Sequence, residues 1–133
     1  MESLRIQIPS LVENIRIVES FIDNVKDQFN IDDDIYGNIM VAITESVNNA
    51  IRHGNKEDKH KNVTLSAVCG DGSLTFTVED EGPGFDPDSL EDPTAPENLE
   101  KTGGRGIFLM KHLSDEVKFS NEGRKVELTF YFS

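Results

Sequence analysis

The chain has 133 residues, of which 36% are hydrophobic, and this length suits one domain with a single core, spanning residues 1–133. Its formal net charge is −12, from 25 acidic and 13 basic side chains without an evident basic patch, so we expect no nucleic-acid surface. It shows no apolar run long enough to span a membrane, no basic and apolar secretory signal, and one cysteine, Cys69, so we expect a cytoplasmic protein.

The first part of the chain predicts one strand followed by two helices. Apolar and polar residues alternate over 4–8, which indicates a short strand. Ser10 can cap a helix that runs to about residue 29 at helical apolar spacing. The acidic run over 32–34 supplies first-turn negative charge for a second helix, which we expect to end near Gly54.

The second part predicts strands over 63–69, 74–78, 117–119 and 126–132, and a helix over 106–113. One layer of strands and one of helices give a two-layer α+β sandwich. Between them, residues 81–105 contain four prolines and few apolar side chains. A connection of this length inside a compact domain is either disordered or a functional lid.

A polar pair borders the apolar stripe of the second helix. Ile39, Ile43 and Ala50 lie near the centre of the stripe, whereas Glu45 and Asn49 lie along one border, one turn apart. Both polar side chains can point into a cleft. Taken alone, the pair favours the simpler alternative of a solvated helix border, with a hydrogen bond between the two.

A carboxylate follows the strand predicted over 74–78. If the apolar residues of this strand face the core, the period of two places Asp80 inward as well, where an ionised carboxylate needs a hydrogen-bond donor. The exocyclic amine of a purine supplies one, and Gly82 and Gly84 allow the backbone to approach a planar ligand closely. The alternative is an ordinary turn in which Asp80 accepts from local amides.

Three glycines, at positions 103, 104 and 106, precede the last predicted helix. Free amides at a helix start can face phosphate oxygens, and Arg105 would add a cation there. A plain loop hinge is the competing explanation. The order and spacing of all three constellations together are much harder to produce by chance.

Together these motifs resemble those of the GHKL ATPase superfamily, most closely its small anti-sigma factor serine kinase branch. The resemblance rests on ESVNNAIRHG over 45–54 (the N-box), DEGPGF over 80–85 (the G1 box) and GGRGIFLM over 103–110 (the G2 box). It covers nearly the whole chain, and the first two motifs are highly specific. It implies a Bergerat-type ATP-binding fold with a mixed, mostly antiparallel sheet, and an ATP lid over about 86–104.

The resemblance implies ATP and Mg²⁺ as cofactors and a role for each polar residue that matches. Glu45 corresponds to the general base, and Asn49 to the amide that coordinates magnesium at the ATP site. Asp80 corresponds to the carboxylate that bonds the adenine amino group. His53 falls where this branch often carries a histidine, but a structural histidine at a helix end explains it equally well.

The glycines of the motifs have implied roles too. Gly82 and Gly84 correspond to residues that line the base pocket, and Gly104 and Gly106 to residues that close over the phosphates. Arg105 is a further phosphate contact, although other members carry apolar residues there.

The final hairpin departs from the family pattern. Family members often carry threonine just after the glycine of this hairpin, near adenine, whereas here Gly123 is followed by Arg124 and Lys125. The contact is therefore lost, or comes from Thr129 or from water.

Three other reactive side chains carry no function in this interpretation. Cys69 lies on an inward-facing alternation and is expected to be a core thiol. His60 and His112 lack a second ligand at metal spacing, so we expect them at the surface.

The resemblance implies a protein serine kinase that transfers the γ-phosphate of ATP to a serine of an antagonist protein of the anti-anti-sigma (STAS) type, in a partner-switching circuit. It also implies a homodimer formed through the first strand and helix, and in some circuits a sigma factor as partner. The alternative is an ATP-gated binding module, with little catalysis, that sequesters a sigma factor or other regulator. The catalytic domain of a histidine kinase is disfavoured, because the helix predicted over 10–29 holds no histidine to accept phosphate.

Overall fold

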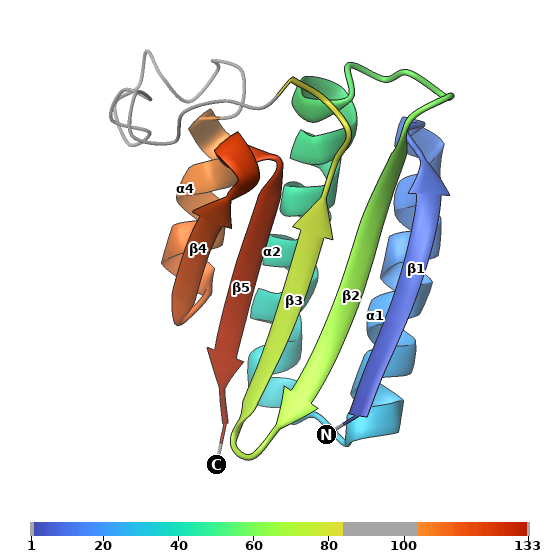
Figure 1. Cartoon of the computed structure of the whole chain (residues 1–133). Helices are drawn as coiled ribbons and strands as arrows, with labels where there is room; N and C mark the ends of the chain where they lie inside the picture. The colour runs from blue at the N-terminus through green and yellow to red at the C-terminus, as the bar shows by residue number, and fades with distance from the viewer. Residues whose placement is uncertain (1, 84–103, 133) are drawn as a thin grey trace.

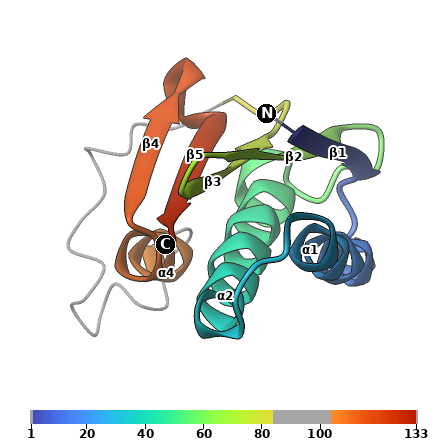
Figure 2. The same ribbon diagram turned by 90° about the horizontal axis from the view of Figure 1, so that it is seen from below.

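The computed structural model describes residues 2–83 and 104–132, which form a five-stranded sheet with helices packed on one face (Figures 1 and 2). The strands are β1 (Glu2–Pro9), β2 (Asn62–Gly70), β3 (Ser73–Glu79), β4 (Glu116–Ser120) and β5 (Lys125–Tyr131). The helices are α1 (Ile15–Phe29), α2 (Asp33–Asn49) and α4 (Gly104–Leu113), with short helical turns η1 (Val12–Asn14), η2 (Ala50–Gly54) and η4 (Asn121–Gly123). The predicted two-layer α+β sandwich is confirmed.

The sheet has the strand order β1-β2-β3-β5-β4, and every pairing between described strands is antiparallel. The prediction of a mixed sheet was therefore wrong. The segment between β3 and β4 includes α4 and brings β4 into the same direction as β3 (Figure 1). These two strands do not pair, because β5 lies between them and runs against both.

The core lies between the sheet and the helices. Alternate residues of β2, β3 and β5 are buried, as the period-two pattern predicts, and the Phe76 and Phe130 rings meet edge to face at 6.1 Å. The β2–β3 hairpin turns at Asp71 and Gly72, where Gly72 has a φ of 73° that glycine adopts without strain.

The start of the first helical segment differs from the prediction. Ser10 does not cap it: the chain opens with η1, whose N-cap position is Leu11, and no side chain caps that turn. Ser10 is fully buried, and its hydroxyl donates to the carbonyl of Lys61 at 2.6 Å. The long-range partner outcompetes the local cap, since the end of β1 lies beside the start of β2.

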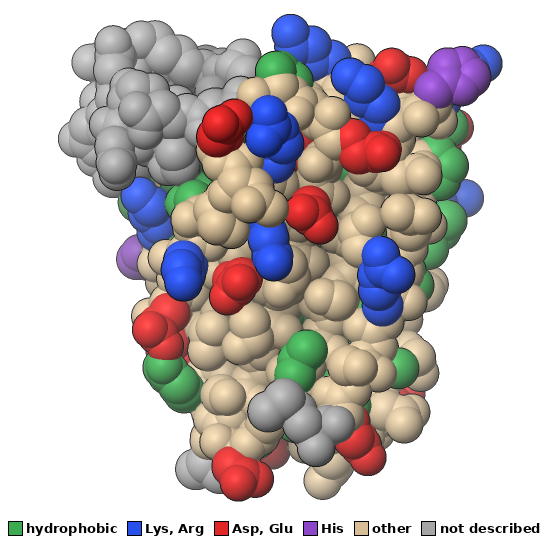
Figure 3. All heavy atoms as spheres, in the orientation of Figure 1, with side chains coloured by type: hydrophobic (Ala, Val, Ile, Leu, Met, Phe, Trp, Pro, Cys, Tyr) green, Lys and Arg blue, Asp and Glu red, His purple; other side chains and the backbone are tan. Residues whose placement is uncertain are grey.

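The outer face of the sheet carries no helix in the described part of the chain (Figures 1 and 2). Figure 3 shows few hydrophobic side chains on this face, with charged side chains of both signs scattered over it. His60 and His112 are exposed as expected, and Cys69 is partly buried against the edge of the core. No helix in the described ranges is both long and apolar enough to cross a membrane.

Candidate functional site

Four segments meet at the upper end of the sheet in Figure 1: the end of β3, the turn η2 after α2, the turn η4, and the start of α4. A partly enclosed cavity of about 30 Å³ lies there, with room for an ordered water molecule. Its polar lining comes from Ser46, Asn49, His53, Asp80 and Arg124, and its apolar lining includes Val78, Met110, Phe119 and Val126.

Asp80 lies at the end of β3 and is 9% exposed, as the alternation predicts. Its Oδ1 accepts a hydrogen bond from the Gly82 amide at 2.8 Å, so part of the local-turn alternative holds. Its Oδ2 has no hydrogen-bond donor within residues 2–83 and 104–132. Burial raises the pKa of Asp80 above the ordinary aspartate value, against the lowering effects of the Gly82 amide and of Arg124.

Two glycines bring the turn after Asp80 into contact with η2. A Cβ atom on Gly82 would lie 1.8 Å from the carbonyl oxygen of Gly54. A Cβ atom on Gly54 would lie 2.5 Å from Asp80 Oδ2. Both positions therefore require glycine for steric reasons, and the motif assignment had given a role only to Gly82.

The helix α2 brings Glu45 and Asn49 to this end of the fold, and both side chains are half-buried. They make no hydrogen bond to each other, so the hydrogen bond that belonged to the alternative of a solvated helix border is absent. After Asn49 the helix widens into the π-turn η2, a feature frequent at functional sites. His53 lies on this turn, where burial and then the charge of Arg52 lower its pKa and so favour the neutral imidazole.

The helix α4 begins at Gly104, two residues before the predicted start, and its first turn packs against α2. A Cβ atom on Gly106 would lie 3.6 Å from the Glu45 carbonyl oxygen and 3.8 Å from Asn49 Cβ. The amides of this first turn, which includes Arg105, have no acceptor within the helix and lie next to the polar border of α2. Gly84 and the expected lid, apart from its last residue, lie outside the described residues.

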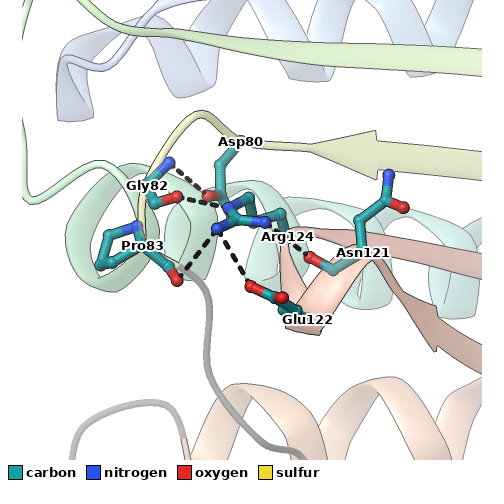
Figure 4. Close-up of polar contacts among 6 residues, drawn as sticks. All are labelled: Asp80, Gly82, Pro83, Asn121, Glu122 and Arg124. Atoms are coloured by element: carbon teal, nitrogen blue, oxygen red, sulfur yellow. Dashed lines mark hydrogen bonds and ion pairs between the residues drawn. The ribbon is translucent and has the colours of Figure 1, made fainter.

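Arg124 links the final hairpin to the turn after Asp80 (Figure 4). Its Nε donates to the Gly82 carbonyl at 2.7 Å and its Nη2 to the Pro83 carbonyl at 3.3 Å. The guanidinium also contacts the Asn121 carbonyl and the Glu122 carboxylate, each at 3.2 Å. The residue that stands in place of the family's threonine therefore braces the glycine turn.

Thr129 cannot replace that threonine, so this suggestion was wrong. Its hydroxyl is 3.0 Å from that of Thr75, its partner across the β3–β5 ladder. The residues on either side of it, Leu128 and Phe130, are buried on the helix side, which places Thr129 on the outer face of the sheet.

Asn55 is a site residue that the sequence patterns do not reveal. It is 1% exposed, and its Nδ2 donates to Ser10 Oγ at 2.7 Å and to the Asn62 carbonyl at 2.9 Å. Its Oδ1 accepts from the amide of Glu81, directly after Asp80, at 2.7 Å. The turn is thus held by Asn55 on one side and by Arg124 on the other.

The donor set fits a magnesium nucleotide. No group of three or more His, Cys, Asp or Glu side chains in the described ranges could hold a metal alone. Mg²⁺ usually needs only one or two protein oxygens, because phosphates and water complete its octahedron. Asn49 and Glu45 offer such oxygens one turn apart, beside the amides of α4.

Residues 8–130 match the family described as the histidine kinase-like ATPase domain. The serine-protein kinase RsbW of Bacillus subtilis (strain 168) is 28% identical over 98% of this chain and 86% of its own length. RsbW of Listeria monocytogenes serovar 1/2a is 23% identical over 99% of this chain and 88% of its own.

A solved structure with the same fold contains the RsbU and RsbW domains of Rv1364c from Mycobacterium tuberculosis. It superposes with a TM-score of 0.70 at 19% identity over 98% of this chain, which spans 32% of that longer one. The relatives named serine-protein kinases agree with the branch that the three motifs indicate. The family match covers most of the length of this chain, and the chain therefore belongs to the histidine kinase-like ATPase domain family.

Proposed function

We propose that this protein is an ATP-dependent protein serine/threonine kinase that phosphorylates a serine of an antagonist protein in a partner-switching circuit. The observation that carries the proposal is Asp80, a buried carboxylate with an acceptor oxygen still unused by the described residues. The names of the relatives, serine-protein kinase RsbW, support the same activity.

Asp80 is suited to the adenine end of ATP. The amine of adenine can donate to Oδ2, while Oδ1 stays bonded to the Gly82 amide. Gly54 and Gly82 present bare backbone next to the carboxylate, so a planar ring can approach closely.

The phosphates then extend toward α2 and the start of α4. Asn49 would hold Mg²⁺ together with the phosphate oxygens, and the ion would neutralise charge that develops during transfer. The amides at Gly104 and Gly106, with Arg105, would bind the phosphate oxygens at the helix start.

Glu45 lies one turn from Asn49 and is suited to act as the general base. It would accept the proton of the serine hydroxyl as that oxygen bonds to the γ-phosphorus and the bond to the departing ADP oxygen breaks. ADP leaves, and the phosphoserine protein dissociates.

The test measures transfer of labelled γ-phosphate to a STAS-type antagonist protein. Glu45→Gln should retain ATP affinity and lose transfer by about a hundredfold or more, whereas Glu19→Gln on the exposed side of α1 should retain both. Unchanged transfer in Glu45→Gln would remove the base assignment. Nucleotide-dependent partner binding without any transfer by the native protein would instead support the ATP-gated binding module.

We further propose a cytoplasmic homodimer, with a sigma factor as a second partner of the circuit. The support is the resemblance to the anti-sigma branch and the free thiol of Cys69, which suits a reducing compartment. Sedimentation equilibrium showing only monomer at high micromolar concentration would contradict the dimer.

A further inference from the structure

Ser46 lies on α2 directly after Glu45 and is 2% exposed. Its hydroxyl has no hydrogen-bond partner among the described residues, and the side chain lines the same cavity as Asp80. Buried hydroxyls nearly always have a hydrogen-bond partner, because a hydroxyl removed from water without one destabilises the folded protein. An unpaired hydroxyl at a cavity therefore points to a partner that binds there.

The helix does not use this hydroxyl, although it uses a similar one nearby. Thr44, two residues earlier, donates to the Met40 carbonyl at 2.7 Å, the usual bond of a hydroxyl inside a helix. Ser46 makes no such bond to its own helix. Its hydroxyl is thus available to a group in the cavity.

The cavity suits one water molecule between Ser46 and Asp80. Its volume of about 30 Å³ holds an ordered water, which needs two to four polar partners. Ser46 Oγ can donate to that water, and the water can donate to the unused Asp80 Oδ2. The second water proton is then free for an acceptor on a bound ligand.

We propose that Ser46 is a specificity-determining residue of the nucleotide site, which recognises the purine through one water shared with Asp80. The water donates its second proton to the unprotonated ring nitrogen next to the adenine amine. Hypoxanthine would present an oxygen to the Asp80 carboxylate, which can only accept, and a ring N–H to the proton donated by the water, so it matches neither partner. This inference rests on the proposed function only in placing a purine at Asp80.

Ser46 also accounts for the departure in the final hairpin. Arg124 stands where the family's threonine is expected, and its guanidinium is bonded to the Gly82 and Pro83 carbonyls. Ser46 and Arg124 line the same cavity, so a hydroxyl absent from the hairpin is present there on α2.

The experiment compares Ser46→Ala with Ser114→Ala. Ser114 follows the last residue of α4 and is the matched control, because its buried Oγ also has no partner among the described residues. Calorimetry measures the binding of ATP and of ITP, and thermal unfolding measures the stability of the nucleotide-free protein. Ser46→Cys serves as a second variant that keeps the shape and weakens the hydrogen bond.

We expect Ser46→Ala to weaken ATP binding about fivefold and to leave ITP binding unchanged, while the nucleotide-free protein melts no lower than the native one. Ser114→Ala should have the same melting behaviour as Ser46→Ala and should bind ATP like the native protein. Native affinity for ATP in both Ser46 variants, or equal losses for ATP and ITP, overturns the inference. If the native protein binds neither nucleotide, the proposed function itself fails, which is a distinguishable result.

Discussion

Replacing Gly82 by alanine tests how closely the turn after Asp80 must approach the helical turn η2. The added Cβ would lie 1.8 Å from the Gly54 carbonyl oxygen and 2.5 Å from its carbonyl carbon, whereas ordinary contact begins at 3.4 Å. Both partners are backbone, so no flexible side chain can absorb the overlap. The turn has to move away from η2 by more than 1 Å. A displacement of about this size in a catalytic site can lower the reaction rate about a hundredfold.

We expect Gly82→Ala to lower the free energy of unfolding by about 1–3 kcal/mol, the usual cost of overpacking. ATP affinity should fall by about a hundredfold or more, because the same displacement carries Asp80 and its Gly82 hydrogen bond out of position. Urea unfolding and calorimetry with ATP measure the two effects on one protein sample.

Gly37→Ala is the matched control. Gly37 lies within α2, and a Cβ there would meet nothing within 4 Å. Alanine should therefore stabilise the protein by about 1 kcal/mol through helix propensity, with ATP affinity unchanged. Equal stability and affinity of Gly82→Ala and the native protein would refute the close approach.

Three further predictions concern the same pocket. Arg124→Met should weaken ATP binding about tenfold, because it releases the Gly82 and Pro83 carbonyls. The control Lys125→Met removes an equal charge from the neighbouring residue, and its ATP affinity in calorimetry should stay within about twofold of the native value. Gly106→Ala should fold normally, since its Cβ would make an ordinary 3.6 Å contact, yet lose affinity for ATP and not for adenosine; equal losses would place the phosphates elsewhere. Burial raises the pKa of Asp80, so acidification should weaken adenosine binding at a higher pH than it would for an ordinary aspartate. In the protein without ligand, the contribution of Asp80 to the free energy of unfolding should decline as the pH rises through that raised pKa. Titrations of affinity and of unfolding against pH check both signs, and an affinity independent of pH would contradict them.

The elements that carry a clear period could be predicted from the sequence. The alternation over 74–78 extends to Asp80, so the burial of that carboxylate follows from the pattern alone. The helical spacing around Glu45 and Asn49 likewise places both at one border of α2.

Contacts between segments far apart in the chain could not be predicted in this way. Ser10 has the composition of a helix cap, but its hydroxyl bonds Lys61, and Asn55 bonds both Ser10 and Glu81 across the fold. Local pattern holds no information about which strand end lies beside which turn. The same limit hides the unpaired hydroxyl of Ser46, which shows only when the cavity is formed.

The central claim is that Asp80 binds the adenine of ATP, and calorimetry with ATP and Mg²⁺ on the native protein and Asp80→Asn tests it most directly. The amide keeps an acceptor for the Gly82 N–H but replaces the charged oxygen by a donor that opposes the adenine amine. We predict a loss of about 1.5–3 kcal/mol or more in binding free energy, with Asp27→Asn on the exposed side of α1 unaffected. Native ATP affinity in a folded Asp80→Asn protein would contradict the account.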